Sequence, residues 1–133
     1  MRLVFVCLGN ICRSPAAEGV MRQLAPDLTV DSAGTGGWHV GDAPYGPMQD
    51  AAQVRGIDLS SLRARQFVAA DFTRFDLIIA MDRQNQSDVE RLRPEDNQTP
   101  VRLMAEKDVP DPYYTRDFDG ALTTIENAAR RLL

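Results

Sequence analysis

Apolar residues along the chain gather in short runs that are typical of buried β-strands. Leu3–Val6 is the first run, and its lack of alternation with polar residues indicates a strand covered on both faces. Asp76–Met81 is the clearest later run, and Leu28–Ser32 and Val101–Met104 are shorter candidates. The pattern therefore predicts four strands spread along the chain.

The segment after the first strand has the spacing of a helix with one apolar face. Ser14 is expected to cap its start, with Pro15 at the first helical position. Pro26 should end this helix. The apolar residues that recur at helical spacing are Ala17, Val20, Met21 and Leu24.

Three further helices are predicted. One covers about 48–55 and another about 85–92, and a long loop rich in glycine and proline, 33–47, precedes them. The third lies at the C-terminal end, and its apolar face is formed by Phe118, Leu122, Ile125, Ala129 and Leu132.

Strands that alternate with helices predict an α/β fold, a single domain over residues 1–133. Right-handed crossovers then give a parallel sheet with helices on both faces. In such sheets ligands bind beyond the carboxyl ends of the strands. The loop that begins at Cys7 leaves the first strand at its carboxyl end, so we expect the site there.

The composition argues against several classes of protein. A net charge of −4 is unfavourable for a nucleic-acid-binding surface. No apolar stretch reaches the ~20 residues that span a bilayer, and the first apolar run lacks the features of a signal peptide. With two cysteines and one histidine, His39, we expect neither a disulfide framework nor a metal site, and no cofactor. These observations predict a cytoplasmic protein.

The loop after the first strand reads Cys7-Leu8-Gly9-Asn10-Ile11-Cys12-Arg13-Ser14, the pattern C-x5-R-S. A loop of this length can curl so that its backbone N–H groups point inward at the start of the helix, which makes an anion site for a phosphoryl group. Arg13 adds a planar fork for two phosphate oxygens. Gly9 is expected to supply a positive φ in the curl, with Asn10 the next most tolerant residue.

The same surroundings favour Cys7 as a nucleophile, because amides and a guanidinium stabilise a thiolate. The thiolate can attack phosphorus while Arg13 and the amides stabilise the equatorial oxygens, and water then cleaves the phosphocysteine. A cysteine at the end of a strand is more often a small core residue. The residues around Cys7, at these spacings, outweigh that interpretation.

Four segments together carry a resemblance to a known family. The segments CLGNICRSPAAEG, DSAGTGGWHVG, FDLIIAMDRQN and DPYY resemble the low-molecular-weight protein tyrosine phosphatases over nearly the whole chain. The resemblance implies a four-stranded parallel sheet with flanking helices. It also implies phosphotyrosine-containing proteins as substrates and a tyrosine kinase as a counterpart.

The resemblance also implies roles for single residues. Cys7 matches the nucleophile, Arg13 the phosphate-binding arginine, and Asp111 the general acid, although an aspartate before proline would otherwise suggest a turn former. Trp38 and Tyr113 match aromatic walls beside the substrate ring. The residues expected to line or shape the loop are Leu8, Gly9, Asn10, Ile11, Cys12, Ser14 and Ser32.

Cys12 is open to two interpretations. It is either inert packing or a redox partner of Cys7, which would form a reversible disulfide with it.

Two positions depart from the usual family sequence. Leu62 stands where many members have a histidine that braces the hydrogen bonds of the loop. Gly46-Pro47-Met48 stands where Asp-Pro-Arg is common, and we expect this to alter a helix start rather than the chemistry.

Three other functions fit parts of the sequence. Arginine phosphatases of the same family tend to carry threonine at the position of Ile11 and to lack the paired tyrosines Tyr113 and Tyr114. Thiol-based arsenate reductases relay a disulfide to later cysteines, and none follows Cys12. A phosphate-binding module without turnover would be expected to lose the nucleophile or the acid. The sequence therefore favours phosphotyrosine hydrolysis.

Overall fold

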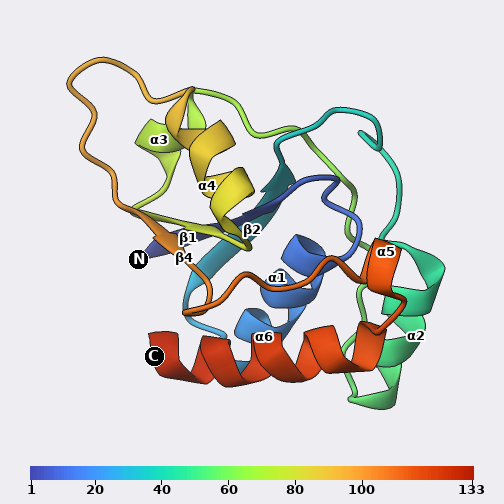
Figure 1. Cartoon of the computed structure of the whole chain (residues 1–133). Coiled ribbons are helices and arrows are strands. Elements are labelled where there is room, and N and C mark those ends of the chain that lie inside the picture. Colours follow the sequence, from blue (N-terminus) through green and yellow to red (C-terminus); the bar gives the residue numbers. More distant parts are fainter.

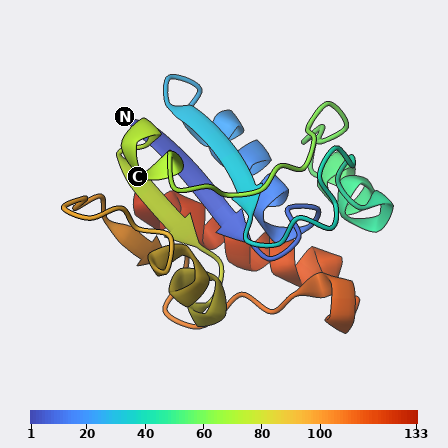
Figure 2. The same ribbon diagram turned by 90° about the horizontal axis from the view of Figure 1, so that it is seen from above.

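Four parallel strands form the centre of the structure, a computed structural model that describes residues 1–133. They lie side by side in the order β2-β1-β3-β4 and point the same way (Figure 2). Their bounds are β1 Arg2–Cys7, β2 Thr29–Gly34, β3 Leu77–Ala80 and β4 Val101–Leu103. The four-stranded parallel sheet is confirmed, and the second strand continues two residues past the predicted Ser32.

Helices cover both faces of this sheet (Figure 1). On one face α1 and α6 pack against each other, with α2 beside α6, while α3 and α4 lie over the opposite face. The helix bounds are α1 Arg13–Leu24, α2 Gly46–Val54, α3 Asp71–Arg74, α4 Arg83–Glu90, α5 Pro112–Thr115 and α6 Phe118–Leu132. None of these helices has the length and apolar character required to cross a membrane.

The position of β1 follows from its unbroken apolar sequence. Leu3 and Phe5 are buried in the cluster shared with α1 and α6, whereas Val4 and Val6 are buried on the other side with Phe72 of α3. A strand with apolar side chains on both faces gains most by lying in the middle of a covered sheet. The chain runs from β1 to α1 on one face and from β3 to α4 on the other, which creates a crevice at the carboxyl ends of β1 and β3.

The start of α1 differs from the prediction. The helix begins at Arg13, the preceding position is held by Cys12, and no side chain caps it. Ser14 is therefore not the N-cap. Its hydroxyl contacts the sulfur of Cys7 and the amide of Asn10 instead.

The starts of α2 and α4 also differ from the predicted ones, because they are set by a proline and by a helix cap that the spacing of apolar residues does not reveal. α2 begins at Gly46, with Pro47 in its first turn. α4 begins at Arg83 because the carboxylate of Asp82 accepts a hydrogen bond from the N–H of Asn85 at 2.7 Å. The four-residue helices α3 and α5 were not predicted, since one turn is too short to show a period.

The packing of α6 against α1 gives a direct test of the core. Leu122 is 0 % exposed in α6, whereas Leu133, just after the helix, is 64 % exposed. We expect Leu122→Ala to lower the free energy of unfolding by about 2–5 kcal/mol, because it removes buried contacts and leaves a cavity. Leu133→Ala, the same change at an exposed position, should stay within about 0.5 kcal/mol of wild type. Urea denaturation of both variants checks this, and equal losses would contradict the assigned core.

Candidate active site

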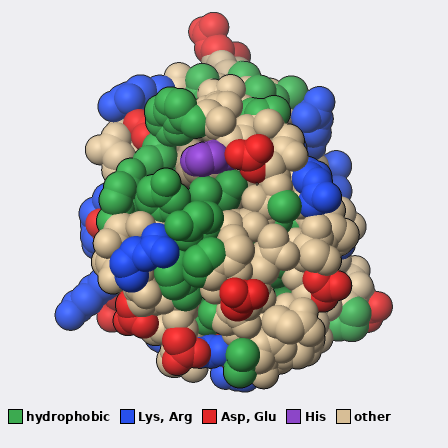
Figure 3. All heavy atoms as spheres, turned by 90° about the vertical axis from the view of Figure 1, so that its right-hand side faces the viewer, with side chains coloured by type: hydrophobic (Ala, Val, Ile, Leu, Met, Phe, Trp, Pro, Cys, Tyr) green, Lys and Arg blue, Asp and Glu red, His purple; other side chains and the backbone are tan.

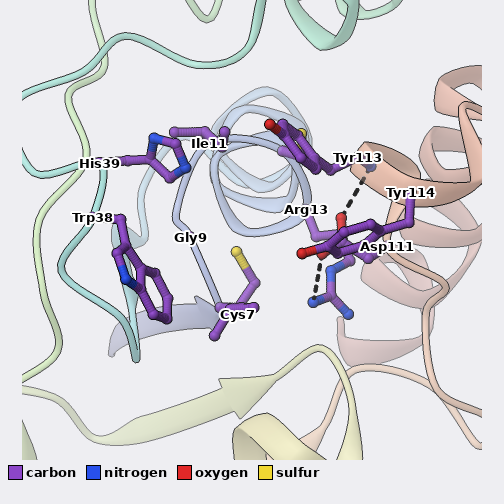
Figure 4. A pocket seen from close by; sticks show the side chains of 11 residues that line it. Cys7, Gly9, Ile11, Arg13, Trp38, His39, Asp111, Tyr113 and Tyr114 are labelled. Atoms are coloured by element: carbon purple, nitrogen blue, oxygen red, sulfur yellow. Dashed lines mark hydrogen bonds and ion pairs between the residues drawn. The ribbon is translucent and has the colours of Figure 1, made fainter.

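A cavity of about 260 Å³ opens where β1 ends (Figure 4). Its lining residues are Cys7, Leu8, Gly9, Ile11, Cys12, Arg13, Trp38, His39, Asp111, Tyr113 and Tyr114. The structure thus brings together segments more than a hundred positions apart in the chain. Of the residues predicted to line this site, Asn10 and Ser14 do not, and both are buried behind the loop.

In the loop between β1 and α1, four carbonyl groups accept backbone hydrogen bonds while most N–H groups have no partner in the chain. The carbonyls of Cys7 and Leu8 accept hydrogen bonds from Thr35 and Gly36, each at 2.9 Å. Those of Ile11 and Cys12 are likewise bonded to backbone N–H groups. The N–H groups that donate to no group of the chain are those of Leu8, Gly9, Ile11, Cys12, Arg13 and Ser14. Such a set of unpaired donors at a helix start is suited to an oxyanion.

The sulfur of Cys7 is buried and accepts two hydrogen bonds. The N–H of Asn10 lies 3.3 Å from it and the Ser14 hydroxyl 3.0 Å. Asn10 Nδ2 also donates to the Ser14 oxygen at 2.8 Å, so the single hydrogen of the Ser14 hydroxyl is shared between the sulfur and the carbonyl of Ala33, 3.4 Å away.

Asn10 holds the curl of the loop. Its backbone has φ 57°, the left-handed conformation that asparagine tolerates better than most residues. Its side-chain oxygen accepts from the N–H of Arg65 at 3.0 Å, and its nitrogen donates to Ser14 and Ser32. Gly9 does not have a positive φ, so that prediction was wrong. A Cβ on Gly9 would instead lie 3.2 Å from the ring of His39, so a side chain at this position would require the imidazole to shift by a few tenths of an ångström.

A buried carboxylate, that of Glu18, is hydrogen-bonded to this network. Glu18 is 2 % exposed and accepts from the Ser32 hydroxyl at 2.7 Å. Burial raises the pKa of Glu18, and the hydrogen bond from Ser32 and the charge of Arg22 partly offset that rise. Arg22 lies 2.5 Å from Glu18 and also donates to the carbonyl of Val30. Leu62 packs against the core cluster, so the loop is braced without a histidine.

Arg13 is buried beside the loop and is held on one side. Its Nη1 donates to Asp82 at 2.7 Å and to the carbonyl of Val109 at 2.8 Å, while its Nη2 lies 3.6 Å from Asp111. Its Nε donates to no group of the chain, so the Nε–Nη2 edge is available for two oxygens of an anion.

The charge of Arg13 is secured by its neighbours. Burial alone would lower the pKa of this guanidinium. The negative charges of Cys7, Asp82 and Asp111 outweigh burial and raise the pKa above its ordinary value. Arg13 therefore stays charged although it is almost inaccessible to solvent.

Asp111 has two roles that the sequence offered as alternatives. It caps α5 by accepting from the N–H of Tyr113 at 3.1 Å, and it lines the cavity near Arg13. A turn-forming aspartate can thus also present its carboxyl group to a ligand. Figure 4 shows it across the cavity from Trp38, with Cys7 between them.

Aromatic side chains form the walls of the cavity. Trp38 and His39 lie on one side, and Tyr113 and Tyr114 on the other (Figure 4). Tyr113 packs against Tyr45 and Tyr114, with ring centroids 5.2 and 5.4 Å apart. On this face of the molecule hydrophobic side chains lie beside the histidine on one side, and an acidic side chain adjoins it on the other (Figure 3). The walls suit a flat apolar group that leads to the anion site.

Cys12 is a free and buried thiol, as is Cys7. Burial, followed by the nearby charges of Cys7 and Asp111, raises the pKa of Cys12 to about 12. It therefore remains a neutral thiol at physiological pH.

Sequence reasoning missed the role of Asp82. Asp82 follows the carboxyl end of β3, a position where parallel sheets place site residues, so a usable signal existed. His39 follows Trp38 in the chain and Tyr114 follows Tyr113, and both line the cavity beside these predicted walls.

Comparisons with known proteins agree with this geometry. The profile of the family described as "Low molecular weight phosphotyrosine protein phosphatase" matches residues 2–133. The Bacillus subtilis protein named low molecular weight protein-tyrosine-phosphatase YfkJ is 38% identical, over 98% of this chain and 92% of its own length. The crystal structure of YfkJ superposes with a TM-score of 0.93 at 36% identity, covering 99% of this chain and 91% of that one.

A second solved structure, of a Drosophila arginine phosphatase, gives a TM-score of 0.93 at 30% identity, with 99% of this chain and 95% of that chain covered. The profile spans nearly the whole sequence, and the match to YfkJ covers 92% of that relative's length. The chain therefore belongs to the low molecular weight phosphotyrosine protein phosphatase family.

Proposed function

We propose that this protein hydrolyses phosphotyrosine in proteins through a phosphocysteine formed on Cys7. The observation that carries the proposal is the loop of unpaired N–H groups that begins at Cys7 and ends at Arg13. Such a loop binds the equatorial oxygens of a phosphoryl group and holds the phosphorus against the sulfur. Membership of the family supports the same class of reaction.

In the first step the Cys7 thiolate forms a bond to phosphorus as the bond from phosphorus to the tyrosine oxygen breaks. The leaving phenolate takes a proton from Asp111, whose carboxyl group lines the cavity. The free Nε–Nη2 edge of Arg13 binds two of the equatorial oxygens in this step.

In the second step water attacks the phosphocysteine. Asp111, now ionised, takes a proton from that water, inorganic phosphate leaves, and the Cys7 thiolate is restored. The two hydrogen bonds to the sulfur stabilise the thiolate as a leaving group.

Phosphotyrosine is favoured over phosphoarginine by the shape of the cavity. Ile11 lines the cavity within the phosphate loop and is nearly inaccessible to solvent, so its side chain fills space beside the bound phosphoryl group. The tyrosine side chains opposite Trp38 provide an apolar wall for a phenyl ring. Arginine phosphatase is the second candidate, because a Drosophila arginine phosphatase shares the fold at 30% identity.

We place this activity in the cytoplasm, with a tyrosine kinase supplying the phosphoproteins. A cysteine nucleophile needs a compartment that keeps thiols reduced. The role of Cys12 as redox partner stays a prediction: both thiols are free and line the same cavity. Cys12 is a neutral thiol beside Cys7, so it would have to lose its proton as it attacks an oxidised Cys7.

Replacement of the nucleophile tests the covalent mechanism. Cys7→Ser should lower kcat for a phosphotyrosine peptide by about three orders of magnitude or more, because a serine without an adjacent base ionises poorly. Binding of inorganic phosphate, measured by calorimetry, should change little, since Arg13 and the loop N–H groups remain. Steady-state turnover near the wild-type rate would rule out a phosphocysteine.

Replacement of the acid tests proton transfer to the leaving group. Asn also caps helices, so Asp111→Asn keeps the cap of α5 while it removes the acid and its charge beside Arg13. We expect kcat for a phosphotyrosine peptide to fall by about 10²–10⁴-fold. An ester with an acidic phenol, such as 2,4-dinitrophenyl phosphate, should lose far less. Asp117→Asn is the matched control, because Asp117 caps α6 in the same way but does not line the cavity.

Substrate choice is tested at Ile11. We expect Ile11→Thr to raise the ratio of phosphoarginine to phosphotyrosine kcat/KM by about tenfold, because it replaces an ethyl group beside the phosphoryl site by a smaller hydroxyl. The control, Val54→Thr, makes a similar change on the exposed surface of α2 and should leave the ratio unchanged. A wild type that already prefers phosphoarginine would make arginine phosphatase the function.

A further inference from the structure

The indole of Trp38 rests directly on the backbone of Gly36. A Cβ placed on Gly36 would overlap three carbons of the six-membered ring, Cζ3, Cε3 and Cη2, and the farthest of these would be only 2.7 Å away. Ordinary carbon–carbon contact needs about 3.5–4.0 Å. The ring can therefore lie where it does only because residue 36 has no side chain.

The backbone of Gly36 gives a second reason to connect it with the ring. Among the glycines, only Gly41 and Gly56 have a positive φ, so the backbone at position 36 is one that other residues can adopt. The conformation of the chain does not require glycine there. Glycine at position 36 therefore serves to leave room for the indole, because it has no Cβ.

The backbone under the indole is hydrogen-bonded to the phosphate loop, residues Cys7 to Ser14. The N–H of Gly36 donates to the carbonyl of Leu8 at 2.9 Å, and that of Thr35 donates to the carbonyl of Cys7 at the same distance. The position of the ring is thus set relative to Cys7 through two backbone hydrogen bonds.

Trp38 has few other restraints. Its side chain makes no hydrogen bond and no aromatic pair in the structure, and the residue is 73 % exposed. The opposite wall differs, because Tyr113 packs against both Tyr45 and Tyr114. Contact with Gly36 is therefore the restraint that sets where the Trp38 wall lies.

We propose that Gly36 is a positioning residue for substrate recognition: it seats the indole of Trp38 and so sets the width of the slot for the aryl ring of the substrate. Gly36 itself does not line the cavity and acts only through Trp38. The proposal rests on the proposed function for its substrate, an aryl phosphate, but the seat of the ring can be measured without any activity.

The test is Gly36→Ala. The overlapping atoms belong to the outer edge of a flexible, exposed side chain, so we expect the ring to move and the fold to keep its thermal stability. Trp38 is the only tryptophan of the chain, so intrinsic fluorescence reports on it directly. Acrylamide quenching of this fluorescence should increase, because the ring loses the backbone that covers one side.

The kinetic signature is a change in KM without a change in the anion site. KM for a phosphotyrosine peptide should rise by about three- to tenfold, the scale of one aromatic contact, with kcat within about twofold of wild type. The inhibition constant of inorganic phosphate, which has no ring, should not change. A general disturbance of the loop would move all three quantities.

Two further variants make the outcome decisive. Gly46→Ala adds a methyl group that meets no atom within 4 Å and should match wild type in quenching and in KM. In a Trp38→Ala background, Gly36→Ala should add nothing to KM. Unchanged quenching in Gly36→Ala, or a KM effect that persists without the indole, would overturn the proposal. A wild type without phosphatase activity would refute the proposed function alone. The quenching experiment would still decide whether Gly36 positions the indole of Trp38.

Discussion

The phosphate loop depends on hydrogen bonds that hold its carbonyl groups away from the cavity. A peptide group is rigid, so fixing the carbonyl of one residue also directs the N–H of the next. The segment after β2 supplies two of these bonds, from Thr35 and Gly36, and the N–H of Tyr45 supplies another to Ile11. The N–H donors of the loop are therefore already oriented before an anion binds, so binding carries no free-energy cost for orienting them.

The same arrangement places a buried positive charge among compensating negative ones. Arg13 is held on one side by Asp82 and the carbonyl of Val109, and its free edge lies in the cavity. An unpaired guanidinium in this position would be costly to bury. Asp82 reduces that cost and also keeps the fork from rotating, so the charge serves both stability and recognition.

The sequence identified those parts of the site that are contiguous. Residues Cys7 to Ser14 carry their chemistry in a single loop, and the apolar runs around them predicted the sheet and the main helices. Asp111 was assigned through family resemblance alone, because its distance from Cys7 along the chain gives no geometric information. Asp82 was missed although it follows a predicted strand.

The errors within the loop have a common physical cause. Ser14 looked like a helix cap and Gly9 like a left-handed turn residue, since both are the usual local solutions. In the structure, Ser14 is engaged by Cys7 and Asn10, and Gly9 lies under the ring of His39. Contacts from elsewhere in the fold replaced the local preference in each case.

The side chain of Asn10 uses every hydrogen-bonding position that an amide offers: one oxygen acceptor and two N–H donors. Aspartate has the same shape but no donor, so a single exchange of nitrogen for oxygen would leave two hydroxyl groups facing an acceptor. The hydroxyl of Ser14 would then turn its hydrogen from the sulfur to the new carboxylate. A negative charge would also stand behind the loop that must receive a phosphoryl anion. Replacement of Asn10 by the isosteric aspartate would therefore reverse the direction of its hydrogen bonds with Ser14 and Ser32.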